Sequence, residues 1–246
     1  MWKITGVSGT ITSMSQEKFD FEKRWLEKFA RCIEKVAGKA ICEEVMKGSE
    51  NLSDLSLRDD VVEWSEAAMN RLHSFVDEKE RVDIMTGCAC QYPEEDLQDV
   101  RKKYEETKDI DVAHTMLQEK FTSFLKNTLS LENDMINDIL MRGWGLAGVR
   151  ERKKIIATKI PKSRYLLAYM QETDRVKKRA LYCHCPRVRD MLENNGAGLP
   201  ITYCYCGAGF YKMIWEEILQ KPVQVEVLQS VMKGDDVCTI AIRLPQ

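Results

Sequence analysis

Apolar residues recur at helical spacing through the first 142 residues of the chain. Between Glu17 and Lys47 they fall on one face of a helix, as a 3.6-residue period requires. Ser56 has the character of an N-cap, which predicts that a second helix begins there. Pro93 and the acidic residues after it are typical of a helix start. Two further helices are predicted over the ranges Val112–Leu129 and Leu131–Met141.

Beyond residue 142 the apolar positions alternate in shorter segments. "KKIIATKI" (153–160) and "RALYCHCP" (179–186) predict strands, and the apolar positions after "CGAG" predict a helix that ends before Pro222. "PVQVEVLQ" and "VCTIAIRL" alternate with period two and are joined by the turn "KGDD", which predicts a terminal antiparallel hairpin. Its predicted core residues are Val223, Val225, Val227, Ile240 and Ile242.

These patterns predict an α+β fold in which a helical N-terminal half packs on an α/β domain with an antiparallel sheet. The change of pattern places the boundary near "GWGLAG", with residues 1–142 helical and residues 143–246 forming the α/β domain. One continuous domain is the alternative, because 246 residues can bury a single core.

Composition and charge narrow the classes of function. A hydrophobic content of 44% and a charged content of 31% are typical of a globular protein. The net charge of −2 gives no general attraction to nucleic acid or to anionic lipid. No run of about 18 apolar residues predicts a membrane span, and the N-terminal residues lack a signal-peptide pattern. We therefore expect a cytoplasmic protein without nucleic-acid or membrane partners; a homodimer is left open.

Nine cysteines include three pairs in which one residue separates the two thiols: "GCAC" (87–90), "YCHCP" (182–186) and "YCYCG" (203–207). In an extended segment residues i and i+2 project from the same face, whereas on a helix they lie about 200° apart. We therefore expect extended pairs, with Cys183 and Cys185 on one face and His184 on the other.

Clustered cysteines without a secretion signal favour metal binding over disulfides. Thiolates in a tetrahedron suit zinc, and all-sulfur sites also suit an iron–sulfur cluster. The alternative is that cysteine, a small apolar side chain, fills a core, which is our interpretation of Cys32 and Cys42. The predicted metal ligands are drawn from Cys88, Cys90, Cys183, Cys185, Cys204, Cys206 and Cys238.

A family resemblance is carried by "CP" at Cys185 and Pro186, a cysteine about twenty residues later, the segment "GFYKMIWEEIL" and "GDDVCTIAI". Over residues 181–245 the chain resembles domains of the 4-vinyl-reductase type, and more closely the L-2-amino-thiazoline-4-carboxylic acid hydrolase-like proteins. The resemblance implies an α/β fold around a small-molecule pocket and a structural zinc, with Cys204 or Cys206, and Cys238, at ligand positions. Ser230 stands where a cysteine is usual in the family, so other cysteines would have to complete a different site.

The resemblance implies a hydrolase that opens a small C=N or C–S substrate with metal-activated or acid-activated water. The candidate catalytic residues are Cys206, His184 as proton carrier and Glu226 as base, with Asp236 as a weaker choice because it belongs to the turn. The alternatives are a non-catalytic module that senses a ligand around a structural zinc, and an iron–sulfur redox protein.

Cys204 and Cys206 precede a glycine turn and a predicted helix, so we expect their sulfurs near the positive helix terminus, which lowers thiol pKa and favours anions. Aromatic side chains surround them, and aromatic walls are typical of ligand sites. We therefore expect a small anionic ligand here, in contact with residues drawn from Tyr203, Tyr205, Phe210 and Tyr211.

Three further signals carry less weight. "GWGLAG" matches a dinucleotide-binding pattern but follows a helix, without the strand that such a motif needs. The basic run "RERKKIIATKIPKSR" (150–164) could contact an anion, but runs of this kind are usually solvated faces. His73 and His114 each lie alone in helical patterns, so we interpret them as structural histidines.

Overall fold

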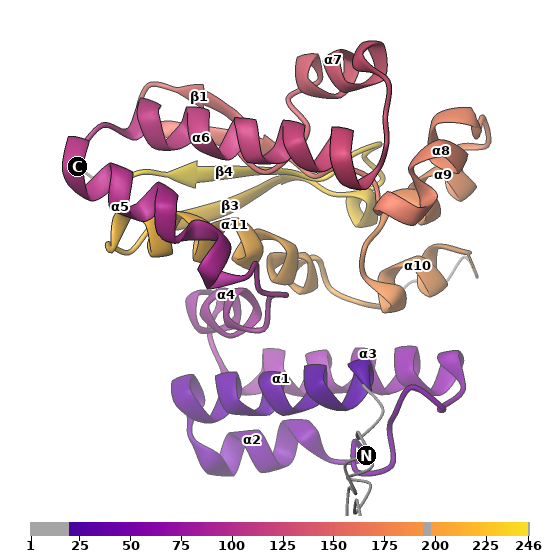
Figure 1. The fold of residues 1–246 in the computed structure, drawn as a ribbon. Helices are drawn as coiled ribbons and strands as arrows, with labels where there is room; N and C mark the ends of the chain where they lie inside the picture. The colour runs from indigo at the N-terminus through magenta and orange to yellow at the C-terminus, as the bar shows by residue number, and fades with distance from the viewer. Residues whose placement is uncertain (1–19, 194–197, 246) are drawn as a thin grey trace, which may run out of the picture.

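The computed structural model describes residues 20–193 and 198–245 of the chain (Figure 1). Helices of the N-terminal region occupy one end of the view, and a small sheet with further helices occupies the other. The helices α4 and α11 lie between these two parts. The fold is α+β, as predicted.

The first four helices pack on one another. The predicted helix over 17–47 is two helices in its described part, because Gly38 interrupts it with a φ of 87°; residues 17–19 lie outside the described residues. The side chain of Asp20 caps the first helix by accepting a hydrogen bond from Lys23 N. The four are α1 (Phe21–Ala37), α2 (Lys39–Met46), α3 (Arg58–Phe75) and α4 (Glu78–Gly87).

Ser56 is not the N-cap of α3, so that prediction is wrong. Leu57 occupies the cap position without a side-chain hydrogen bond. The hydroxyl of Ser56 instead accepts a hydrogen bond from Ser53 N at 3.0 Å, within the turn before the helix. The Ser56 hydroxyl is thus used in a local turn and does not cap the helix.

The remaining N-terminal helices follow the sequence pattern closely. The 3₁₀ turn η1 (Glu94–Leu97) follows Pro93 and leads into α5 (Gln98–Thr107). Helix α6 (Ile110–Ser123) continues into the π-helical turn η2 (Phe124–Thr128), and α7 (Asn133–Met141) follows. The helices predicted from these ranges are confirmed.

The sheet is antiparallel throughout, with strand order β1-β2-β4-β3. Its strands are β1 (Val149–Glu151), β2 (Lys154–Thr158), β3 (Gln224–Gln229) and β4 (Thr239–Arg243). The terminal hairpin is confirmed, with the short turn η5 (Val231–Lys233) and Gly234, at φ 93°, between its strands. Of its predicted core residues Val225 is half-buried and the other four are buried.

The strand predicted over 179–186 is wrong. Its first half belongs to helix α9 (Arg175–Tyr182), which Asp174 caps by accepting hydrogen bonds from Val176 N and Lys177 N. Lysine, arginine, alanine and leucine favour helix there, and Ala180 and Tyr182 form the buried face. The neighbouring elements are η3 (Ser163–Tyr165), α8 (Leu166–Gln171) and α10 (Pro186–Glu193).

The glycine turn predicted after Cys206 is also wrong. A 3₁₀ turn, η4 (Ile201–Cys204), leads directly into α11 (Tyr205–Leu219), so Gly207 and Gly209 lie inside the helix. Cys204 and Cys206 are therefore helical rather than extended. A Cβ on Gly209 would lie 2.0 Å from Thr86 O. Glycine is needed here because α11 approaches the backbone of α4.

One hydrophobic core runs through both parts of the chain. It includes Phe29 and Leu72 from the N-terminal helices, and Ile214, Trp215 and Ile242 from α11 and the sheet. In the described parts of the chain, no helix is both long enough and apolar enough to span a membrane.

Candidate functional site

A cavity of about 700 Å³ lies in the interior, where the N-terminal helices meet the sheet region. Its wall is assembled from segments far apart in sequence. These include α1 (Phe21, Trp25), the segment after α4 (Cys90, Tyr92), the α6–η2 junction (Lys120, Phe121, Phe124), the segment after β2 (Lys159–Ser163), the α9–α10 connection (Tyr182–Val188), the start of α11 (Cys204, Cys206, Gly207, Phe210, Tyr211) and the hairpin (Val227, Ser230, Val231, Cys238, Ile240).

Six of the seven cysteines predicted as metal ligands line this one cavity. They are Cys90, Cys183, Cys185, Cys204, Cys206 and Cys238. Cys88 lies behind the wall, buried at the end of α4, where its thiol donates to Ile84 O at 3.0 Å. The sequence marked these cysteines as candidate ligands but left open whether Cys90 joins the C-terminal ones, and it did not predict the helical backbone that carries two of them.

Two of the cavity thiols contact other protein groups. Cys204 Sγ lies 3.0 Å from Ser230 Oγ and 3.3 Å from Met232 Sδ. Cys206 Sγ lies 3.8 Å from Cys88 O. Across the described residues, no three cysteine, histidine or acidic side chains are grouped so that they could hold a metal ion. With these side-chain positions the thiols do not form a closed metal site, and zinc or an iron–sulfur cluster stays a prediction.

Burial controls the ionisation of the cavity thiols. It raises the pKa of Cys204 and of Cys206 to about 12, and it raises the pKa of Cys183 well above the ordinary thiol value. The predicted lowering of thiol pKa by the helix terminus is therefore wrong, because loss of hydration outweighs the dipole. At neutral pH these cysteines are thiols, not thiolates.

His184 borders the cavity as a neutral imidazole. Its Nε2 lies 2.7 Å from Ile160 O, and because a carbonyl can only accept, this nitrogen carries the proton. Burial of the ring, followed by the charge of Lys159, lowers the pKa of His184. The Nε2 proton is used in a hydrogen bond to the backbone and the ring stays neutral at pH 7. These features favour a structural role for His184 over proton transfer.

The predicted acids lie away from the cavity. Glu226 is exposed on β3 and pairs with Arg243 at 3.0 Å. Asp236 is exposed in the hairpin turn and pairs with Arg175 at 2.8 Å. Neither residue belongs to the described cavity wall.

Most of the predicted aromatic residues line the cavity. Tyr203, Phe210 and Tyr211 do so, whereas Tyr205 does not. Trp25 stands against Tyr203 with ring centroids 5.8 Å apart, although sequence reasoning had assigned it only to a helix core. Further aromatic rings that sequence reasoning missed are those of Phe21, Tyr92, Phe121, Phe124 and Tyr182.

All charged side chains in the described wall are basic: Lys120, Lys159, Lys162 and Arg187. Lys120 pairs with Asp99 at 2.9 Å, and the buried Arg187 pairs with the buried Glu22. Lys159 and Lys162 were missed as site residues, although both belong to the basic run 150–164 that could contact an anion.

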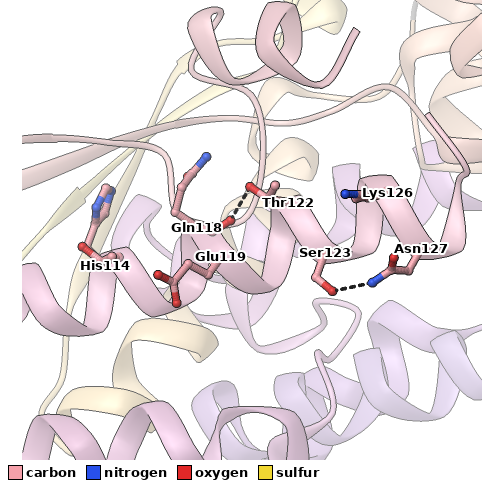
Figure 2. A pocket seen from close by; sticks show the side chains of 8 residues that line it. His114, Gln118, Glu119, Thr122, Ser123, Lys126 and Asn127 are labelled. Carbon is pink, nitrogen blue, oxygen red and sulfur yellow. Dashed lines mark hydrogen bonds between the residues drawn. The ribbon is translucent and has the colours of Figure 1, made fainter. Parts of the chain in front are cut away.

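A second hollow lies on the outside of α6 and η2 (Figure 2). All its lining residues come from this one helix and its π-helical continuation, and Figure 2 shows their polar side chains spread along that helix. His114 Nε2 lies 2.9 Å from Gly148 O, and His73 Nε2 lies 3.0 Å from Thr202 Oγ1, so both histidines are structural as predicted. The hollow has the features of a solvated helix face.

Comparison with known proteins finds one family model that matches part of the chain. A family model described as "Family of unknown function (DUF6144)" matches residues 130–246. No curated protein and no solved structure matches the chain. The matched residues contain α7, the sheet and α8–α11, and hence much of the cavity wall.

Proposed function

We propose that the protein binds a small, largely apolar molecule in the central cavity and does not transform it. The observation that carries this proposal is the cavity itself, because about 700 Å³ lies within the range of small-molecule sites. Aromatic rings and thiols form about half of its wall, and few polar groups are present to fix orientation, which is also typical of such sites.

The chemistry of the wall favours binding over the hydrolase prediction. Hydrolysis needs a general base or an activated nucleophile near the substrate. The described wall contains no carboxylate, the thiols of Cys204 and Cys206 are protonated, and His184 is neutral with its Nε2 proton on a backbone carbonyl. These features support a ligand-sensing or carrier role.

The finer family assignment remains our proposal. We propose a vinyl-reductase-like arrangement for residues 181–245, supported by the order in which α11 separates Cys204 from the β3–β4 hairpin.

A zinc ion held by at least three of the predicted cysteines would require their side chains to turn toward one point. Elemental analysis of purified protein tests for zinc, and a brown colour would indicate an iron–sulfur cluster. The nine free thiols support a reducing compartment such as the cytoplasm.

Titration with N-phenyl-1-naphthylamine, a neutral apolar dye whose fluorescence rises when it leaves water, tests the binding proposal. We expect saturable binding at one site per chain. Cys206→Phe places a ring inside the cavity and should weaken binding by about tenfold or more. Cys42→Phe makes the same change on α2, outside the cavity, and should leave the affinity unchanged. Absence of saturable binding, or equal effects of the two substitutions with both variants folded by circular dichroism, would refute the proposal.

A further inference from the structure

This inference rests on the proposed function and concerns Lys159, whose backbone is fixed at the end of β2. Its N–H donates to Cys238 O at 2.9 Å, and its carbonyl accepts from the hydroxyl of the buried Tyr182. That hydroxyl also accepts from Cys238 N at 2.9 Å. These hydrogen bonds therefore fix the backbone of Lys159 between the start of β4 and the end of α9.

The side chain of Lys159 reaches the first turn of α11. Its Nζ lies 3.3 Å, and its Cδ 3.8 Å, from the place where a Cβ on Gly207 would stand. Because Gly207 has no side chain, the ammonium group can lie against the helix backbone beside Cys206. Both residues line the cavity, so the ammonium group is part of its wall.

The charge of Lys159 lacks a counterion within the described residues. Lys120 and Arg187, which share the wall, each pair with a carboxylate, but no described acid lies within ion-pair distance of Lys159. The groups near its charge are the thiols of Cys183, Cys204, Cys206 and Cys238 and the imidazole of His184, and thiols solvate a cation poorly. A half-buried ammonium ion in such surroundings favours an anionic partner.

The other wall residues indicate which kind of molecule bears the anionic group. Trp25, Tyr203 and Phe210 offer aromatic surfaces, and thiol sulfur packs well against aromatic rings. Lys162 also lines the wall without a described acidic partner, but Lys159 is the lysine whose ammonium group lies beside Cys206. A single ammonium group suits a carboxylate, whereas phosphate groups usually draw several donors or a guanidinium fork. We propose that Lys159 binds the carboxylate of an aromatic carboxylic acid whose ring lies against these side chains.

The experiment uses displacement of N-phenyl-1-naphthylamine by two ligands of similar shape, 1-naphthoate and the neutral 1-naphthalenemethanol. For the wild-type chain, naphthoate should displace the dye at about tenfold lower concentration than the alcohol. Lys159→Met should remove this preference, with each displacement corrected for the affinity of the dye for that variant. Lys159→Arg should keep most of the preference, because it keeps the charge.

Lys162→Met is the matched control, since Lys162 also lines the cavity without a described acidic partner. It should leave the preference for naphthoate intact. A preference that survives Lys159→Met, or that Lys162→Met removes instead, would overturn the assignment while leaving the binding proposal standing. Failure of the dye to bind the wild-type chain would overturn both.

Discussion

Burial, rather than neighbours in sequence, sets the ionisation state of single residues in the cavity. Cys204 and Cys206 lie at the start of α11, where a helix dipole favours thiolate, yet burial raises the pKa of both thiols to about 12. Sequence analysis could identify the group of cysteines, because their spacing is local. It could not give the sign of the pKa shift, since burial depends on α1, α4 and the hairpin closing around them.

The raised pKa of Cys206 predicts that the unfolding free energy falls at alkaline pH, in protein freed of metal by a chelator. A folded-state pKa above the ordinary 9.0 makes the thiol stabilise the fold below pH 9. This contribution is lost as the pH rises from 9 toward 12. At pH 10, Cys206→Ala should recover about 1 kcal/mol of the unfolding free energy that the wild type loses between pH 7 and pH 10, as measured by urea denaturation.

Cys90→Ala is the control for the alkaline experiment, because it removes a thiol from the exposed part of the same cavity. It should leave the wild-type pH dependence in place. A Cys206→Ala variant that loses as much stability between pH 7 and pH 10 as the wild type would contradict the role assigned to this thiol.

Lys159 shows a different limit of sequence reasoning at this scale. The basic run 150–164 is visible in the sequence, but most such runs face solvent. The position of Lys159 against α11 depends on where β2 ends and on the space left by Gly207, a residue 48 positions further along the chain. Neither fact follows from local pattern.

Among whole elements, the helices and the terminal hairpin were predictable because period and turn chemistry are local. The segment 179–185 was not, since tyrosine and cysteine there suggested a strand while the deciding cap, Asp174, lay outside the segment. The glycines of "CGAG" were interpreted as a turn. Gly209 instead serves close packing between α11 and α4, which sequence alone does not distinguish from a turn.

Gly145, in the connection from α7 to β1, provides a test at the scale of elements. It has a φ of 126°, and a Cβ would lie 2.2 Å from the ring of the buried Phe121. Gly145→Ala should therefore lower the unfolding free energy by about 3 kcal/mol, through backbone strain and displacement of that ring.

Gly38→Ala is the matched control for Gly145→Ala. Gly38 also has positive φ, 87°, but a Cβ there would meet nothing within 4 Å. This change should cost only the backbone strain, about 1 to 2 kcal/mol at φ 87° and ψ 165°. Equal losses of stability for the two variants in urea denaturation would show that contact with Phe121 is unimportant.

Across the whole molecule, a buried ion network joins residues far apart in the chain. Glu22 of α1 accepts from both Arg187 of α10 and Arg58 of α3, and Arg58 also pairs with Asp190 at 2.7 Å. The guanidinium of Arg187 lies 4.0 Å from the ring centroid of Trp25, which borders the cavity. The network therefore ties the N-terminal helices to α10 beside the cavity.

Removing one partner from this network should be costly. Arg187→Met should lower the unfolding free energy by about 3 kcal/mol, because it leaves the carboxylate of Glu22 buried beside Arg58 alone. Glu22→Gln together with Arg187→Met should cost less than the sum of the single changes, by about 1 kcal/mol or more. Urea denaturation of the four proteins in the cycle measures this coupling.

Lys79→Met is the control for the buried network, since it breaks the exposed pair between Lys79 and Asp83. It should leave the unfolding free energy close to that of the wild type, because exposed ion pairs contribute little to stability. Additive losses for Glu22→Gln and Arg187→Met would show that the two residues stabilise the fold independently.

The contact between Gly209 and Thr86 has a consequence for kinetics. Because α4 and α11 meet backbone to backbone, no side chain can rotate aside between them, and parting the two helices would break core packing along both. If the proposed ligand binds, we expect it to exchange through the irregular parts of the wall, near Cys90–Tyr92 and Lys159–Ser163, rather than between α4 and α11. The residence time of a bound molecule should then follow the opening rate of these short segments, and global unfolding should be too slow to set it.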